Sequence, residues 1–371
     1  MGVNPSTKRS TESLKFRGEL DPLSPYKPPR MSLEAAAEQI GPDGSSNGGY
    51  VKLTSNELSF GPLPEAETTM KEALPRLNRY PDRHVGALRE AVAAANPGTE
   101  PGNVLVGNGS SEVLFNLLQL VERPGEVVSP WPSFGLYGAI ATVLGLELIK
   151  VPLAGDHQVD LGALHAAVTP ETRSIILSNP NNPTGTYLTL DEVRSFAETL
   201  PEGVLLILDE AYQEFVSDPD YHGSHTLALE MPNVVVARTF SKAHGLAGLR
   251  VGYGLAPERV ADYAERVRFP FSVNLVAQAA AVASMQAREK IAGRAEFIIR
   301  ERDRMQEAFA AASLDYIPSQ GNFVMVHTEP EVFERAGVLV REGEALGYPA
   351  GWSRVTVGNS EENDRVIGAL S

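Results

Sequence analysis

Cysteine is absent from this 371-residue sequence, so the chain can form neither disulfides nor thiolate nucleophiles or ligands. A chain without disulfides fits a cytoplasmic protein, and we expect it there. Basic residues are also few, because 32 Lys and Arg face 47 Asp and Glu, which gives a formal net charge of -15. Such an acidic surface repels polyanions and argues against nucleic acid and anionic membranes as partners.

Long apolar runs are missing as well. No stretch is long enough to span a bilayer, and residues 1–10 are polar where a secretory signal would have an apolar core. Hydrophobic residues still make up 43% of the chain, which is enough for a sizeable core. A chain of this length predicts two domains, or one large domain with an appendage.

Residues 1–49 are expected to form an N-terminal arm that is partly disordered. The stretch Leu20–Pro29 contains four prolines, too many for regular structure. Residues 41–49 are rich in glycine, serine and asparagine, which is the composition of a loop. Ordered structure should therefore begin near Val51.

From there to about residue 270, apolar segments of strand length alternate with helical ones. The strand-like segments are each followed by polar or glycine-rich sequence. They are Asn103–Val106, Glu126–Ser129, Leu146–Val151, Ser174–Leu177, Val204–Leu208 and Val234–Ala237. Continuous apolar strands that alternate with helices predict a mostly parallel sheet covered on both faces. The prediction is an α/β fold with a large domain over residues 50–270.

The pattern changes after Pro270. An alanine-rich helix is predicted over residues 274–285 and a long charged helix around 295–307. Two strand-like segments with turn signals around them follow, at Asn322–Val326 and Ser353–Val357. This mixture predicts a smaller α+β domain over residues 271–371.

One lysine, Lys242, stands just past the predicted strand 234–237, where open α/β sheets hold their ligands. A desolvated lysine can form a Schiff base with an aldehyde. The neighbouring hydroxyls of Thr239 and Ser241, with Arg250 further on, suit a phosphate. An aldehyde and a phosphate on one small molecule describe pyridoxal phosphate. The alternative at this point is a surface loop with an ordinary solvated lysine.

Asp209 directly follows the wholly apolar segment 204–208, so its carboxylate needs a positive partner. In a pyridoxal phosphate site the protonated ring nitrogen is that partner. Without a cofactor, Asp209 would be a helix N-cap. Tyr212 and Asn182 are candidates to bind the ring hydroxyl, although residues 182–185 also read as a turn.

The stretch Gly107–Glu112 follows a strand and opens a helix, so its backbone N–H groups and serines suit a phosphate. The third glycine of the dinucleotide fingerprint is missing, which argues against a dehydrogenase. Phe134 either stacks on a heteroaromatic ring or belongs to the core.

Taken in order, these motifs resemble the fold-type I pyridoxal phosphate aminotransferases. Within them the chain looks like the histidinol-phosphate aminotransferase family, closest to the aromatic (phenylalanine) branch. The matching stretches are Leu53–Glu57, Asn78–Asp82, Gly107–Glu112, Asn179–Gly185, Asp209–Tyr212, Thr239–Arg250, Gly321–Phe323 and Arg354–Gly358. The resemblance implies a homodimer with shared active sites, pyridoxal phosphate as cofactor, and no metal.

The resemblance also assigns roles. Lys242 would bind the cofactor and move the proton at the substrate Cα, Asp209 would pair with the ring nitrogen, and Tyr212 and Asn182 would bind the ring hydroxyl. Phe134 would stack on the ring. The cofactor phosphate would be held by Ser110, Ser111, Thr239, Ser241, Arg250 and the partner subunit's Tyr80. The substrate side would be formed by Arg354 at the α-carboxylate, Arg341 near the tail, and Tyr26 and Asn56, which would close the site.

Two amino donors compete for this site. The stretch Phe269–Asn274 is rich in aromatic and apolar groups, and its Phe271 stands where many histidinol-phosphate enzymes have tyrosine. Together with the stretch 53–64, it favours an aromatic amino acid, phenylalanine or tyrosine, with 2-oxoglutarate as acceptor. The alternative is histidinol phosphate, as in histidine biosynthesis.

Other classes of function stay open. A pyridoxal phosphate decarboxylase or lyase shares this fold, whereas the complete lysine, aspartate and arginine set argues against a non-catalytic binding module. His244 stands where the family usually has phenylalanine or tyrosine, and we expect a structural role for it.

Overall fold

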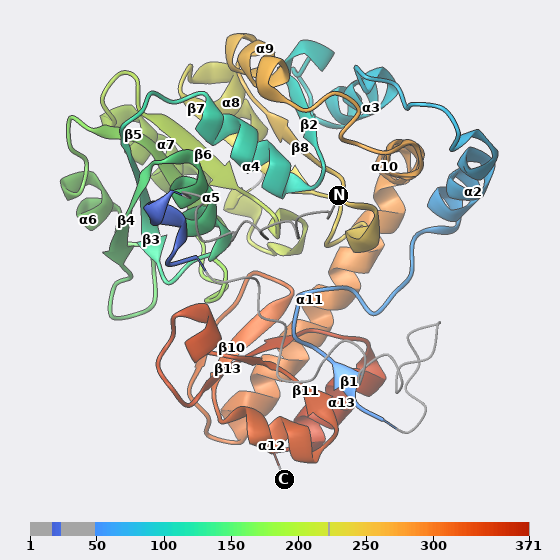
Figure 1. The fold of residues 1–371 in the computed structure, drawn as a ribbon. Coiled ribbons are helices and arrows are strands. Elements are labelled where there is room, and N and C mark those ends of the chain that lie inside the picture. Colours follow the sequence, from blue (N-terminus) through green and yellow to red (C-terminus); the bar gives the residue numbers. More distant parts are fainter. Residues whose placement is uncertain (1–16, 24–48, 222, 371) are drawn as a thin grey trace, which may run out of the picture.

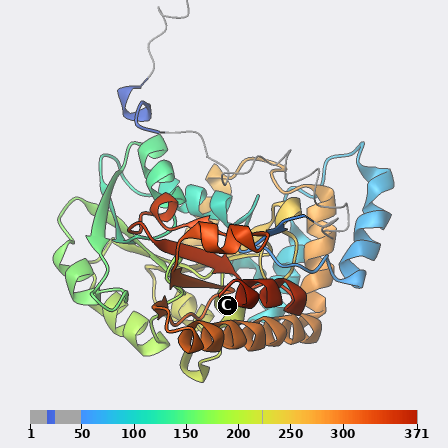
Figure 2. The same cartoon turned by 90° about the horizontal axis from the view of Figure 1, so that it is seen from below.

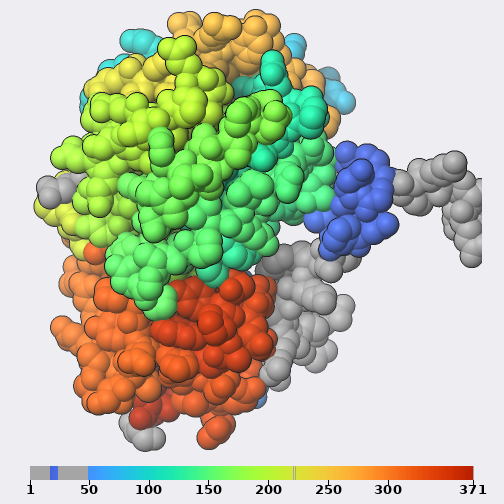
Figure 3. Space-filling model, turned by 90° about the vertical axis from the view of Figure 1, so that its left-hand side faces the viewer, coloured from blue at the N-terminus to red at the C-terminus, as the bar shows by residue number. Residues whose placement is uncertain are grey.

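The computed structural model describes residues 17–23, 49–221 and 223–370. Most of the predicted arm, Tyr26 included, lies outside the described residues. The described part of the arm, residues 17–23, contains the 3-10 helix η2 (Gly18–Leu20). This helix packs against α5 (Leu136–Leu144) and is the blue segment in Figure 3. The Arg17 guanidinium donates a hydrogen bond of 2.7 Å to the Val143 carbonyl of that helix.

A seven-stranded sheet with the order β2-β8-β7-β6-β5-β3-β4 forms the centre of the larger part (Figure 1). Its strands are β2 (Val104–Gly107), β3 (Glu126–Trp131), β4 (Glu147–Pro152), β5 (Thr172–Ser178), β6 (Leu205–Asp209), β7 (Val234–Thr239) and β8 (Gly252–Leu255). Strands β4, β3, β5, β6 and β7 pair in parallel, whereas β8 runs antiparallel to β2 and β7. The predicted α/β class and mostly parallel sheet are confirmed.

Helices cover both faces of this sheet because successive strand residues face opposite ways. In β6, Ile207 packs into a core with α4 (Ser110–Gln119), α5 and α9 (Glu258–Val267). Leu206 and Leu208 point to the other core, with α6 (Leu161–Ala166), α7 (Leu190–Thr199) and α8 (His225–Glu230). This burial on both sides explains why the central strands are continuous apolar runs.

A smaller antiparallel sheet of order β12-β13-β10-β9 lies near the C-terminus. Its strands are β9 (Tyr316–Ile317), β10 (Phe323–His327), β12 (Arg341–Glu342) and β13 (Trp352–Thr356). The 24-residue α11 (Arg288–Ala311) runs from the larger part down to this sheet (Figure 1). Seen from below, α11 lies along the C-terminal strands and beside α13 (Ser360–Gly368) (Figure 2).

Two contacts cross between the predicted domains. β1 (Val51–Lys52) pairs in parallel with β11 (Val338–Leu339), which contacts α12 (Pro330–Arg335). The chain segment that precedes the larger part therefore packs with the C-terminal part. Conversely, α10 (Leu275–Gln286) packs against α2 (Pro64–Ala73) and α3 (Gly86–Ala95) of the larger part. The division at residue 270 stays a prediction.

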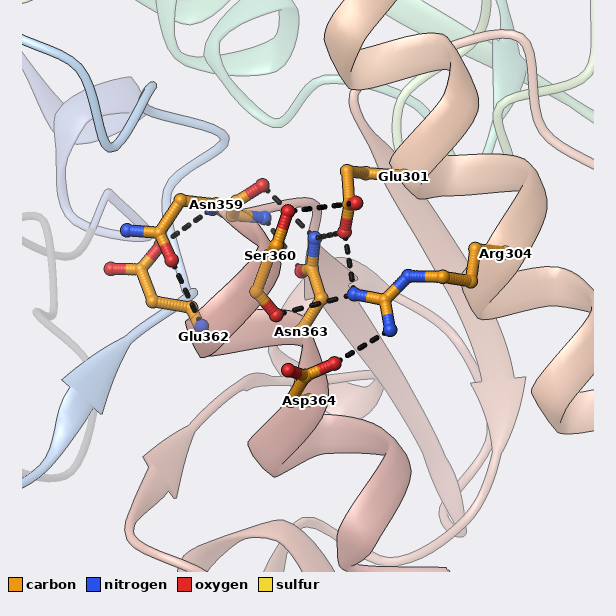
Figure 4. A network of polar contacts seen from close by, with 8 residues as sticks. Glu301, Arg304, Asn359, Ser360, Glu362, Asn363 and Asp364 are labelled. Carbon is orange, nitrogen blue, oxygen red and sulfur yellow. Dashed lines mark hydrogen bonds and ion pairs between the residues drawn. The ribbon is translucent and has the colours of Figure 1, made fainter.

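A polar network fastens α13 to α11 (Figure 4). The helix begins with a capping box between Asn359 and Glu362. Asn363 donates to Glu301 Oε2 of α11 at 2.8 Å and accepts from the Gly358 N–H at 2.9 Å. Arg304 also bonds Glu301 Oε2, at 2.7 Å. The network fixes the loop that leaves β13, the strand that carries Arg354.

Within the described residues, no helix combines the length and the apolar character needed to cross a membrane.

Candidate active site

The predicted site residues come together because they follow neighbouring parallel strands. Asn182 lies in the loop after β5, Asp209 is the last residue of β6, and Lys242 lies three residues beyond the end of β7. The carboxyl ends of parallel strands meet at one edge of a sheet, where α/β proteins hold their ligands. Arg354, on β13 of the smaller sheet, reaches the same place from the other part of the chain.

Lys242 sits in a largely desolvated position. Its Nζ donates to the Ser55 carbonyl at 2.9 Å and lies 5.7 Å from the centre of the Tyr212 ring. Burial, and secondarily the charge of Arg354, lowers the pKa of the amine to about 7. A lysine that is partly deprotonated near neutrality can act as a nucleophile and as a proton carrier.

Asp209 has two carboxylate oxygens in different surroundings. Oδ2 accepts a hydrogen bond of 2.8 Å from the buried Tyr137 hydroxyl. Oδ1 is buried and accepts no hydrogen bond of good geometry from the described residues. Burial raises the pKa of Asp209 to about 6, although Tyr137 and the backbone N–H of Ala211 lower it. An oxygen with these surroundings fits a cationic partner such as a protonated ring nitrogen.

A chain of hydrogen bonds joins four of the predicted residues. The Tyr212 hydroxyl accepts from Asn56 Nδ2 at 3.0 Å and from Asn182 Nδ2 at 3.3 Å. Asn182 Oδ1 in turn accepts from Arg354 Nη1 at 2.5 Å. Asn56 is also held by the Thr356 hydroxyl, which accepts from its backbone N–H at 2.9 Å. The amide groups of Asn56 and Asn182 are thus oriented around one phenol oxygen.

The predicted phosphate residues gather at the start of α4. Ser110 and Ser111 are the first residues of that helix, and Gly109 precedes them with φ 78°. Arg250 lies so close that a Cβ at Gly109 would stand 2.4 Å from its Nη2. Arg250 Nη1 donates to Ser241 Oγ at 3.2 Å. A guanidinium beside hydroxyls and a helix N-terminus suits a phosphate dianion.

Thr239 belongs to the same group, since its Oγ1 accepts from the Ser241 N–H at 3.1 Å. Phe134 is 37% exposed and stands edge-on to Tyr137, with ring centres 5.6 Å apart. Arg341 is the Cα partner of Arg354 across β12 and β13. Residues directly opposite in an antiparallel pair project from the same face, so the two arginines are neighbours.

Tyr80 does not join the buried site of its own chain. Its side chain is 83% exposed and stacks on Phe271, with ring centres 4.6 Å apart and planes at 25°. The expected role of Tyr80 at the phosphate of a partner subunit stays a prediction.

His244 is buried and neutral. Its Nδ1 lies 2.7 Å from Ser284 Oγ, and burial lowers its pKa to about 3. It makes none of the site contacts described above, in keeping with the structural role expected for it.

Tyr137 is the site residue that the sequence analysis missed. It follows Phe134 by one helical turn, and a fully buried aromatic residue in a helix looks the same in sequence whether it bonds a carboxylate or fills the core. Only the partner, Asp209, 72 positions away, reveals the difference.

Fold and site together define a pyridoxal phosphate enzyme of fold type I. The family model for aminotransferases of class I and II matches residues 49–370, so the chain belongs to that family and is an aminotransferase. Pyridoxal phosphate is its cofactor. When bound, the cofactor draws electron density from the substrate Cα, which makes the Cα proton acidic.

Two relatives and one solved structure show which aminotransferases the chain resembles. A histidinol-phosphate aminotransferase of Rubrobacter xylanophilus is 71% identical over 96% of this chain and 100% of its own length. An aromatic amino acid aminotransferase of Nocardia farcinica is 44% identical over 87% of this chain and 92% of its own. The fold is also similar to the crystal structure of histidinol-phosphate aminotransferase from Sinorhizobium meliloti with pyridoxal-5'-phosphate, with a TM-score of 0.82. The match covers 99% of this chain and 97% of that one, at 29% sequence identity.

Proposed function

We propose that this chain is a histidinol-phosphate aminotransferase, which transfers the amino group of histidinol phosphate to 2-oxoglutarate. The 71% identity to a relative of that name, over that relative's full length, supports this substrate. Relatives named for aromatic amino acids are less similar, at 44% and 40%. The sequence motifs alone favour an aromatic donor, whereas the comparisons favour the alternative, histidinol phosphate.

The structural observation that carries the proposal is the pairing of Arg341 with Arg354 across β12 and β13. Histidinol phosphate has a phosphate where an amino acid has its α-carboxylate. A phosphate dianion uses two guanidinium groups, whereas one bidentate arginine satisfies a single carboxylate. The same pair can bind the carboxylates of 2-oxoglutarate in the second half of the reaction.

The remaining residues have proposed roles that follow from their positions. Lys242, with a pKa near 7, removes the proton from the substrate Cα and returns it to the product. Asp209 holds a proton on the ring nitrogen through Oδ1. Tyr212 and Asn182 orient the ring hydroxyl, and Phe134 covers the ring face.

The cofactor phosphate is proposed to lie at the α4 N-terminus, against Ser110, Ser111, Thr239, Ser241 and Arg250. A homodimer would bring the partner subunit's Tyr80 to that phosphate. We also propose that the two domains divide at residue 270. A cytoplasmic location, which fits the lack of cysteine, is part of the same proposal.

The test compares amino donors on one preparation of the holoenzyme with 2-oxoglutarate as acceptor. We expect kcat/KM for histidinol phosphate to exceed that for phenylalanine and tyrosine by at least tenfold, which corresponds to about 1.4 kcal/mol. An advantage for phenylalanine would restore the aromatic assignment. Release of carbon dioxide without transfer of the amino group would identify a decarboxylase instead.

A further inference from the structure

A loop of the smaller part meets the larger part of the molecule beside the proposed substrate residues. The loop joins β12 to β13, and these two strands carry Arg341 and Arg354 as direct partners. Gly347 in the loop, with φ 81°, lies so near the larger part that a Cβ there would stand 3.2 Å from Trp131 Nε1. In Figure 3 the green and red parts of the surface meet along this boundary. The loop therefore influences how the β12–β13 hairpin (residues 341–356) lies against the larger part.

The side chain of Tyr348 spans this boundary. Its ring is buried with Ile317 and Met325 in the small core of the smaller sheet. Its hydroxyl lies 2.7 Å from Nδ1 of His157, which belongs to the loop between β4 and α6 of the larger part. Burial raises the pKa of Tyr348, so the phenol stays protonated and can donate to the imidazole. The side chain is thus fixed in one part by its apolar ring and in the other by its hydroxyl.

The backbone of Tyr348 is connected to both strands of the hairpin. Its N–H donates to the Gly343 carbonyl at 2.9 Å, and the Gly343 N–H donates to the Trp352 carbonyl at 2.7 Å. Gly343 follows Arg341 by two residues, and Trp352 precedes Arg354 by two. A displacement of Tyr348 would therefore be transmitted to both arginines.

His157 is held firmly on the other side of the boundary. Its φ of 67° lies in the left-handed region, which histidine enters more readily than most residues but still uncommonly. Its N–H donates to the Ala154 carbonyl at 2.9 Å, and its carbonyl accepts from the Thr186 hydroxyl at 3.1 Å. The imidazole also stands edge-on to Trp352, with ring centres 5.6 Å apart. An unusual backbone conformation that is fixed in this way directs the ring toward the hairpin.

The loop that holds His157 also contains a proposed site residue. Residues 179–186 include Thr186 and Asn182, and Asn182 Oδ1 accepts from Arg354 Nη1. This loop thus reaches the hairpin twice, directly through Asn182 and indirectly from Thr186 through His157 to Tyr348. The second connection ends in the loop between the two arginines, so it acts on both strands.

We propose that His157 and Tyr348 are positioning residues, whose hydrogen bond holds the β12–β13 hairpin where Arg341 and Arg354 receive the anionic groups of the substrates. The proposal rests on the proposed function, which assigns these arginines to substrate. A displaced hairpin weakens the binding of histidinol phosphate and of 2-oxoglutarate, because the same arginines serve both half-reactions. The chemical step changes less, because Lys242 belongs to the larger part.

Tyr348→Phe tests the proposal, because it removes the hydroxyl and keeps the ring. In the holoenzyme, we expect KM for histidinol phosphate and for 2-oxoglutarate to rise by roughly threefold to tenfold, as for one lost hydrogen bond, with kcat changed by less than about twofold. A contact that only stabilises the fold would lower Tm and leave both KM values as in the wild type, which would overturn the proposal. Tyr316→Phe is the matched control, since Tyr316 lies on β9, at the opposite edge of the sheet from β12, and both KM values should stay unchanged.

His157→Asn tests the other partner of the hydrogen bond. Asparagine tolerates the left-handed backbone, but its side chain is too short to replace the imidazole. The KM values should rise at least as much as in Tyr348→Phe. Adding Tyr348→Phe to His157→Asn should then raise them by less than about twofold more, because the two changes remove the same hydrogen bond. Effects that multiply in the double variant, or wild-type KM values in His157→Asn, would contradict the proposal.

The comparison of amino donors separates this proposal from the proposed function. If the wild type uses phenylalanine better than histidinol phosphate, the substrate assignment fails. The same criterion then applies to KM for phenylalanine and for 2-oxoglutarate, whose carboxylates also suit an arginine. A rise in both values would support His157 and Tyr348 as positioning residues, and unchanged values would overturn that role.

Discussion

At the scale of single residues, the ionisation of Asp209 depends on the hydroxyl of its neighbour Tyr137. The Tyr137 hydroxyl donates to Asp209 Oδ2 at 2.8 Å and lowers the pKa of that carboxyl, which burial raises. Oδ1 has no hydrogen-bond partner among the described residues, which suits the role proposed for it at the ring nitrogen. Tyr137 is thus a positioning residue, which keeps Asp209 ionised and fixes the direction of its second oxygen.

Tyr137→Phe should therefore narrow the pH range of activity from the acidic side. Without the hydroxyl, the folded-state pKa of Asp209 rises above about 6, so the carboxylate becomes protonated at a higher pH. The midpoint of the acidic limb in a plot of log kcat against pH should move upward, with kcat at neutral pH reduced on the order of tenfold.

Tyr221→Phe is the matched control for this change. Tyr221 is also buried, but its hydroxyl donates to Glu210 Oε1 at 2.6 Å rather than to Asp209. Its loss should leave the acidic limb in place. If both variants shift the limb equally, or if neither does, Tyr137 does not act through Asp209.

The arginine pair gives a second prediction at this scale. Arg341→Ala should lower kcat/KM for histidinol phosphate by about 10- to 100-fold, since a charge-assisted hydrogen bond contributes roughly 1.5–3 kcal/mol. The value for phenylalanine should change by less than threefold, because Arg354 alone satisfies one carboxylate. The exposed Arg335, on α12, provides the control substitution Arg335→Ala, which should affect neither donor. Equal losses for both donors would show that Arg341 does not discriminate between histidinol phosphate and phenylalanine.

That several of the candidate site residues lie together could be predicted from the sequence, for a physical reason. Lys242, Asp209 and Asn182 each follow an apolar run, and strand ends in a parallel sheet meet at one edge. The contact between Arg354 and Asn182 joins residues 172 positions apart, so spacing could not give it. Tyr137 could not be found in this way, because it lies on helix α5 and its partner Asp209 ends strand β6, 72 positions along the chain.

At the scale of elements, the strands buried on both faces were predictable and β8 was not. β8 reads Gly-Tyr-Gly-Leu, with two glycines that weaken any strand pattern. The packing explains them: a Cβ on Gly252 would stand 2.2 Å from the backbone nitrogen of Ser110. A close approach to the α4 N-terminus requires glycine there, and the phosphate region depends on that approach.

The α11–α13 junction supplies the prediction at this scale. Asn363 is fully buried and bonds both Glu301 and the Gly358 backbone. Asn363→Ala leaves the Gly358 N–H and one oxygen of Glu301 short of a partner, which should cost about 1–3 kcal/mol. We expect a clear fall in Tm by calorimetry or fluorescence-monitored heating.

The neighbouring Asp364→Ala is the control, because it removes an exposed ion pair with Arg304 that contributes less than about 1 kcal/mol. A fall in Tm for Asp364→Ala as large as that for Asn363→Ala would show that the buried amide of Asn363 contributes no more to stability than the exposed ion pair.

At the scale of the whole molecule, several large apolar side chains are exposed although the chain carries a formal net charge of -15. Tyr80 and Phe269 are 83% and 68% exposed, and Leu74 and Leu77 are 53% and 55% exposed. Of these, Tyr80 stacks on Phe271, which is itself 37% exposed, so two large exposed rings lie together. Exposed apolar side chains that gather in this way suit a protein interface, which agrees with the proposed homodimer.

Sharing of sites in that dimer can be tested by mixing two defective subunits. A Lys242→Ala chain lacks the catalytic amine but keeps Tyr80, whereas a Tyr80→Phe chain keeps Lys242 but cannot donate its hydroxyl to a partner. In the mixed dimer, the site that contains Lys242 receives an intact Tyr80 from the other chain. Activity should rise above the sum of the two parents and approach one working site per heterodimer.

Measured activity should follow the fraction of heterodimer, which mass spectrometry of the exchanged subunits gives directly. Leu77→Asp, at an exposed leucine three positions before Tyr80, should weaken dimer formation and with it the recovery of activity. If subunits exchange fully and activity stays at the sum of the parents, Tyr80 serves its own chain or none. That outcome would leave the stack of Tyr80 on Phe271 as a structural contact within one chain.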